Sequence, residues 1–227
     1  SFWDEPGYLE ALTESGKAVT DTAPRSTRVL FSAHGLPLSV ARKDLYPGQI
    51  AATVAAVCQR LDLTLDPIVI PNRELGTGSR EQGGADSSSQ SSVFGSPSLT
   101  GNRQPTTDNH ATTPHSSLLT PHFPTLTPHF PHRASLAWQS KAGPAKWLQP
   151  SVGTMLERWS KEGVKDVVLV PVAFVSEHSE TLYELDVLYG DMARDLGMAV
   201  RRVPTVQTHP RFIEALAAKV KSACATK

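Results

Sequence analysis

The stretch FVSEHSETLYELD, residues 174–186, combines one histidine with four carboxylates and directly follows an apolar run. If a helix begins near Ser176, then Glu177, Glu180 and Glu184 lie at positions i, i+3 and i+7 and share one helix face. Carboxylate oxygens with an imidazole beside them suit protons or a divalent cation such as iron(II), manganese, magnesium or zinc. The alternative interpretation is a solvated acidic helix face, with its first glutamate favoured by the helix N-terminus.

A second histidine follows another apolar run. His34 comes directly after STRVLFSA, residues 26–33, and precedes GLP, whereas His178 stands among the carboxylates. A lone histidine in a turn is commonly incidental, but in open parallel sheets ligands bind beyond the carboxyl ends of the strands. If both apolar runs are strands of one such sheet, both histidines lie at the edge where a ligand would bind.

The elements that would position these groups alternate along the chain. Strand-like runs cover residues 26–33, 135–140, 166–174 and 198–204, and helical patterns cover residues 47–61, 151–163, 179–197 and 208–220. Repeated strand–helix units predict an α/β fold, with a Rossmann-like, open and mainly parallel sheet flanked by helices. The last helix is expected to have Thr208 as its N-cap and an inward face formed by Phe212, Ile213, Leu216 and Val220.

A stretch of different composition interrupts this alternation. From residue 73 to 134, 32 of 62 residues are Ser, Thr, Pro or Gly, so this segment cannot bury enough apolar surface to offset its ordering entropy. The unit LTPHFP occurs in it twice, which indicates a tandem duplication, a histidine-rich metal-binding tract, or untranslated sequence read through in a gene model. We expect one domain from residues 1–72 and 135–227, with 73–134 as a disordered low-complexity insert.

Charge and cysteine content narrow the classes of partner. Lys and Arg together number 22, as do Asp and Glu, so no bulk attraction to nucleic acid is expected. Two distant cysteines support neither a disulfide framework nor a thiolate metal cage, which favours a reducing compartment. The first residues have neither the cationic region nor the apolar core of a signal peptide.

Five blocks of the sequence resemble the second half of ferrochelatase, the enzyme that inserts iron(II) into a porphyrin. In order, they are LFSAHGLP, YPGQIAATV, WQSKAGPAKWLQP, VPVAFVSEHSETLYELD and the ending P-x-F-I-x-x-L. The resemblance implies a chelatase-type Rossmann-like fold and iron(II) insertion into protoporphyrin IX, the last step of heme biosynthesis. It also implies peripheral membrane association, a homodimer, and a location on the matrix side of the mitochondrial inner membrane, or in a plastid or the bacterial cytoplasm.

The resemblance also assigns roles to individual positions. It implies that His34 and Glu180 are catalytic and that the metal meets His34, Glu180, Glu184 and His178. The residues it places against the porphyrin are Trp147, Tyr46, Leu36 and Pro37. Iron(II) is then the substrate, and no resident cofactor is expected.

Two departures from the family pattern matter. Leu188 stands where the family often carries a third carboxylate, and the ending ACATK lacks the cysteine cluster of members that hold an iron–sulfur centre, so no such cluster is expected. Because only one half of the family's fold is represented, two functions stay open: a C-terminal fragment of a metallochelatase, inactive alone, and a noncatalytic metal- or tetrapyrrole-binding half-domain.

Overall fold

The computed structural model describes residues 2–71, 92–94 and 132–225. Most of the predicted insert, including its duplicated LTPHFP units, lies outside the described residues. Within the predicted insert, residues 92–94 form a strand and residues 133–134 begin another, so the predicted boundary at 134 falls inside a strand. For the rest of the insert, the predicted disorder and tandem duplication stay predictions.

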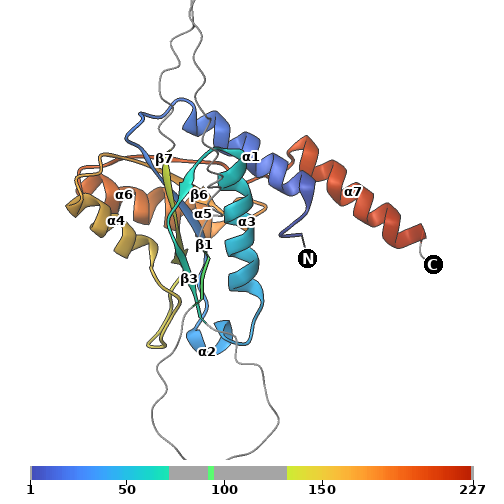
Figure 1. Cartoon of the computed structure of the whole chain (residues 1–227), viewed down its shortest axis with the longest axis horizontal. Helices are drawn as coiled ribbons and strands as arrows, with labels where there is room; N and C mark the ends of the chain where they lie inside the picture. Colours follow the sequence, from blue (N-terminus) through green and yellow to red (C-terminus); the bar gives the residue numbers. More distant parts are fainter. Residues whose placement is uncertain (1, 72–91, 95–131, 226–227) are drawn as a thin grey trace, which may run out of the picture. The chain divides into compact units, whose positions relative to one another are not determined.

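A five-stranded, entirely parallel sheet forms the centre of the fold (Figure 1). Its strands, in spatial order, are β2 (Thr64–Leu65), β5 (Arg133–Gln139), β1 (Arg28–His34), β6 (Asp166–Pro171) and β7 (Ala199–Arg202). In the register, Phe31 pairs with Leu136 on one side and with Val170 on the other. The predicted open parallel α/β sheet is confirmed. A separate antiparallel pair joins β3 (Ile68–Ile70) to β4 (Ser92–Phe94).

Helices cover both faces of this sheet (Figure 1). Because successive strand residues point to opposite faces, Val29 and Phe31 pack with α1 (Pro6–Thr20) and α3 (Tyr46–Arg60), while Leu30 packs with the helices of the other face. Those helices are α4 (Val152–Lys161) and α6 (Tyr189–Asp195). Both sheet faces are therefore buried, as the continuous apolar run of β6 predicts.

Two predicted helices differ from expectation. The single helix expected over 179–197 is divided into α5 (Ser179–Leu182), a π-helical turn η1 (Glu184–Leu188) and α6, and a short helix α2 (Leu38–Ala41) follows β1. The last helix, α7 (Pro210–Ala225), begins at Pro210, so the predicted N-cap at Thr208 is wrong.

The predicted inward face of α7 is also mostly wrong. Phe212 is buried, but Ile213, Leu216 and Val220 are 45%, 39% and 63% exposed. The physical reason is that α7 packs chiefly on α1, where Phe212 meets the ring of Tyr8. None of the helices in the described part of the chain is long and apolar enough to cross a membrane.

Candidate functional site

Three neighbouring strands end at the site, in the spatial order β5, β1, β6. His34 is the last residue of β1, and its Nδ1 lies 2.7 Å from Oε2 of Glu180, which follows β6 at the start of α5. The two residues are 146 positions apart in the sequence. The parallel sheet thus brings together the two side chains that the resemblance pairs as catalytic.

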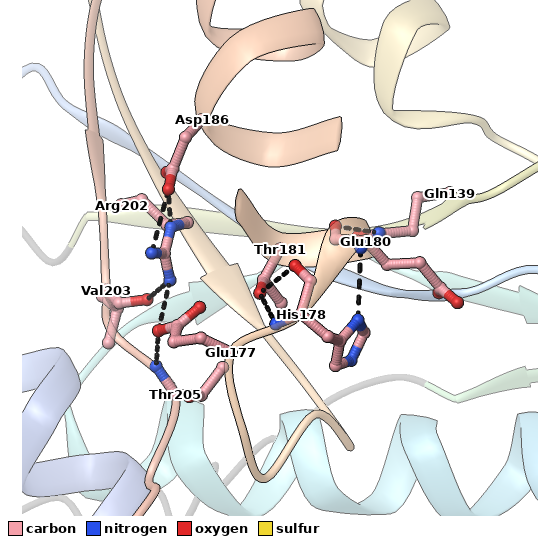
Figure 2. A network of polar contacts seen from close by, with 9 residues as sticks. All are labelled: Gln139, Glu177, His178, Glu180, Thr181, Asp186, Arg202, Val203 and Thr205. Carbon is pink, nitrogen blue, oxygen red and sulfur yellow. Dashed lines mark hydrogen bonds and ion pairs between the residues drawn. The ribbon is translucent and has the colours of Figure 1, made fainter. Parts of the chain in front are cut away.

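A buried glutamine fixes the position of α5 relative to the sheet. Gln139, the last residue of β5, is 1% exposed, and its Nε2 donates to the backbone oxygen of Glu180 at 2.7 Å. Its Oε1 accepts from the Ser32 hydroxyl of β1 at 2.6 Å. Figure 2 shows the Gln139–Glu180 contact. Glu180 is therefore held through its main chain as well as its side chain.

Ser140 joins the two carboxylates that face the strand ends. Its hydroxyl lies 3.0 Å from Oε2 of Glu180 and 2.9 Å from Oε1 of Glu184, and its backbone N–H donates to Glu184 Oε2 at 2.9 Å. A hydroxyl has one proton to donate, so it serves one carboxylate at a time. Ser140 adopts φ = +63°, the left-handed region, which turns both its N–H and its hydroxyl toward Glu184.

The contacts of Glu180 settle its charge and the tautomer of His34. Partial burial raises the pKa of Glu180, but hydrogen bonds with His34 and Ser140 outweigh this and hold the pKa below its usual range. An ionised carboxylate only accepts hydrogen bonds, so Nδ1 of His34 carries the proton and donates it to Glu180. In the neutral imidazole with this tautomer, Nε2 carries the lone pair that can act as a base.

His178 is the N-cap of α5, and this corrects the predicted carboxylate row. Its Nδ1 accepts from the Glu180 N–H at 3.2 Å, and its own N–H donates to Oγ1 of Thr181 at 3.0 Å (Figure 2). The helix therefore begins at Ser179 and not near Ser176. Glu177 precedes the helix, so the prediction that it shares a face with Glu180 is wrong.

Glu177 takes part in a different network, the Arg202 clamp, which consists of Arg202, Glu177 and Asp186. Arg202, at the end of β7, donates to Oδ1 of Asp186 at 2.5 Å, to Oδ2 of Asp186 at 3.0 Å and to Oε1 of Glu177 at 3.0 Å (Figure 2). Glu177 Oε1 also accepts from the backbone N–H of Thr205 at 3.0 Å. The clamp therefore binds chain segments on both sides of α5 to the sheet.

Of the predicted porphyrin-contacting residues, Leu36, Pro37 and Trp147 lie in two loops that pair with each other, and Tyr46 is the first residue of α3. Pro37 and Trp147 form an antiparallel bridge, and Leu148 N–H donates to the Leu36 oxygen at 3.0 Å. The indole Nε1 of Trp147 is buried and has no partner among the described residues. Gly35 permits this arrangement, because a Cβ there would lie 2.7 Å from the backbone oxygen of Gln139.

Tyr46 lies next to the His34–Glu180 pair, through a hydrogen bond with the His34 backbone. Its ring centroid is 6.2 Å from that of Trp138. Burial raises the pKa of the Tyr46 phenol, against a backbone hydrogen bond with His34 that lowers it. The described residues contain no group of three His, Cys, Asp or Glu side chains placed to hold a metal ion, so the ligand roles of His34, Glu180, Glu184 and His178 stay a prediction.

Two contributors were not predicted from the sequence. Gln139 and Ser140 are the last residue of β5 and the residue after it. The rule that singled out His34, testing the residues where apolar strands end, would have selected both.

Comparison with known proteins agrees with the resemblance. A sequence model of the Ferrochelatase family matches residues 1–70 and 110–224. The ferrochelatase of Geotalea daltonii is 33% identical over 225 residues, 97% of this chain and 49% of that protein. That of Sulfurihydrogenibium sp. is 58% identical over 83 residues, 36% of this chain and 25% of that protein. The mitochondrial ferrochelatase of Drosophila melanogaster is 33% identical over 212 residues, 92% of this chain and 38% of that protein.

The chain thus spans about half or less of the length of these relatives. Among solved structures, the CbiX protein of Marinobacter aquaeolei aligns with a TM-score of 0.40 and 12% identity, over 88% of this chain and 99% of that one. That similarity is too low to bear on fold or function.

Proposed function

Because the chain belongs to the ferrochelatase family, we propose that it supplies the metallation half of a porphyrin metallochelatase, which inserts iron(II) into protoporphyrin IX. The observation that carries this proposal is the 2.7 Å contact between His34 and Glu180 at adjacent strand ends. It supplies an imidazole base oriented by an ionised carboxylate.

His34 would accept a pyrrole proton at Nε2. Metal insertion releases two protons from the pyrrole nitrogens, so the site needs a base whose pKa lies near neutrality. Glu180 holds Nδ1–H and would stabilise the imidazolium that forms. Because Gln139 holds the main chain of Glu180, the pair needs no rearrangement before the proton moves.

Glu184 and Glu180 would offset the hydration that the incoming dication loses. The Ser140 hydroxyl lies between the two carboxylates and can rotate to donate to either one. The carboxylate that does not receive this hydrogen bond is then free to meet a cation. Iron(II) is the substrate in this scheme. Trp147, Tyr46, Leu36 and Pro37 would contact the porphyrin, and a rigid cleft lined by aromatic rings would favour the distorted macrocycle of the transition state.

Further expectations rest on the family alone. They are a homodimer, peripheral attachment to a membrane, and no iron–sulfur cluster. The relatives include bacterial ferrochelatases and a mitochondrial one, so either compartment is consistent with the family.

A noncatalytic metal- or tetrapyrrole-binding half-domain is the second candidate. It is compatible with the same family match, which covers 49% or less of the length of the proteins compared above. Such a module would bind porphyrin without needing an oriented base.

A metal-insertion assay separates the two functions. Loss of protoporphyrin fluorescence is followed after adding iron(II) or zinc to this chain and to the full-length gene product, with and without residues 73–131, a deletion that leaves β5 intact. We expect His34→Ala to abolish insertion, and His209→Ala to retain it, because His209 contacts Glu14 outside the site. Wild-type turnover in His34→Ala would contradict the assigned base, and porphyrin binding without insertion by the full-length product would favour the half-domain.

A further inference from the structure

A cavity of about 410 Å³ lies along the outer edge of β5. Its lining comes from β5, residues 66–69, residues 149–150 and α4, and includes none of the residues that hold the His34–Glu180 pair. Its apolar wall is formed by side chains that are at most 6% exposed, namely Ile68, Leu136, Trp138 and Met155. Because small-molecule pockets measure roughly 300–1,000 Å³, the cavity is large enough for a ligand, and buried residues form its apolar wall.

The edge of β5 is unpaired where it borders the cavity. On one side, Asp66 N–H donates to the Ala134 oxygen at 2.8 Å, and on the other, Trp138 N–H donates to the Pro150 oxygen at 2.9 Å. Alternate residues of a strand present their N–H and C=O groups to the same edge, so those of Leu136 face outward between these bonds. No described residue pairs with them. The cavity wall therefore offers a main-chain donor and acceptor.

Among the charged groups of the described residues around the cavity, hydrogen-bond donors without a partner outnumber acceptors without a partner. Both oxygens of Asp66 are occupied, one by Arg133 and the other by the Ser135 hydroxyl. Arg158 uses only Nε, which donates to Glu162 at 2.8 Å, and its two terminal amino groups have no partner among the described residues. A guanidinium with free amino groups matches the geometry of a carboxylate.

We propose that this cavity binds a small amphipathic carboxylate. The apolar body of the ligand packs against Trp138 and Met155, and its carboxylate meets the free amino groups of Arg158. The Leu136 N–H supplies a further donor. The lining of this cavity includes none of the residues assigned to metallation.

The test uses 2-naphthoate as the probe, titrated by calorimetry into the whole chain. 2-Acetylnaphthalene, which has a similar shape and no charge, is the ligand control. Arg158→Gln changes a side chain that is 68% exposed, so folding is preserved, and Arg194→Gln is the matched control at a 56% exposed position of α6, away from the cavity.

We expect 2-naphthoate to bind, with the dissociation constant raised about tenfold or more by Arg158→Gln and unchanged by Arg194→Gln. Thr154→Trp, at an exposed lining position, fills the cavity and should abolish binding. The proposal is overturned if the wild type shows no binding, if the neutral ketone binds equally well, or if either cavity variant binds like the wild type.

Discussion

Replacing Arg202 by glutamine is expected to destabilise the fold by about 2–4 kcal/mol. The guanidinium is 13% exposed and bonds with both oxygens of Asp186 and with Oε1 of Glu177, whereas a glutamine amide can replace one contact at most. Losing the partner of a fully buried charge costs roughly 3–5 kcal/mol. Glu177 is only 17% exposed and approaches that case, but Asp186 is 37% exposed, so water recovers part of its loss.

The loss of stability caused by Arg202→Gln depends on pH in a defined direction. Burial raises the pKa of Glu177, but hydrogen bonds from Thr205, Thr181 and Arg202 outweigh this and lower the pKa below its usual range. A carboxyl group with a lowered pKa in the folded state stabilises the fold at pH values above its unfolded pKa, about 4.3. That stabilisation is lost as the pH falls through the folded pKa. The difference between wild type and Arg202→Gln should therefore be largest near neutral pH and shrink below about pH 4.

Urea unfolding at several pH values measures both effects. Arg201→Gln is the matched control, because Arg201 is adjacent and 38% exposed, and its one ion pair among the described residues, with Asp166, spans 3.8 Å, which is beyond hydrogen-bond distance. Arg201→Gln should lower the free energy of unfolding by no more than about 1 kcal/mol. The reasoning is refuted if Arg202→Gln costs no more than Arg201→Gln at pH 7, or if its cost is the same at pH 3 as at pH 7.

Three further substitutions test the site and the core. Ser140→Ala should raise the pKa of Glu180, because a hydrogen bond that lowers it is lost; a carboxyl ¹³C NMR titration measures this, and an unchanged midpoint would contradict the role given to Ser140. Gly35→Ala should cost about 1–3 kcal/mol in chemical unfolding, since the new Cβ meets the Gln139 oxygen at 2.7 Å; a neutral effect would mean that the loop shifts freely. Trp159→Ala, at a 1% exposed position, should cost about 3–5 kcal/mol, and a smaller loss would indicate that the core collapses around the gap.

Elements with strong local patterns were predictable from the sequence. The apolar run at β6 is buried as expected, and in the helical pattern predicted over residues 47–61 the side chains of Ile50, Val54 and Val57 form the buried stripe of α3. Gly163 and Gly197 end their helical patterns with positive φ angles. In each case, the sequence pattern and the tertiary burial favour the same structure.

Prediction failed where tertiary contacts overrode local pattern. The stripe on α7 has helical spacing, but spacing does not reveal whether another element covers it. The carboxylate row required a helix start near Ser176, and the actual start depends on the cap that His178 forms with Thr181. The left-handed conformation of Ser140 had no glycine to signal it. The pairing of His34 with Glu180 was implied by the family resemblance, and the strand-end rule located only the two regions.

The long separation between His34 and Glu180 has a consequence for how the gene can change. The free energy of closing a flexible loop grows only with the logarithm of its length. Shortening the 146-residue separation by the 62 residues of the low-complexity stretch would change that closure free energy by only about 0.5 kcal/mol. Coding sequence can thus be gained or lost between β3 and β5 while His34 and Glu180 still meet at nearly the same energetic cost.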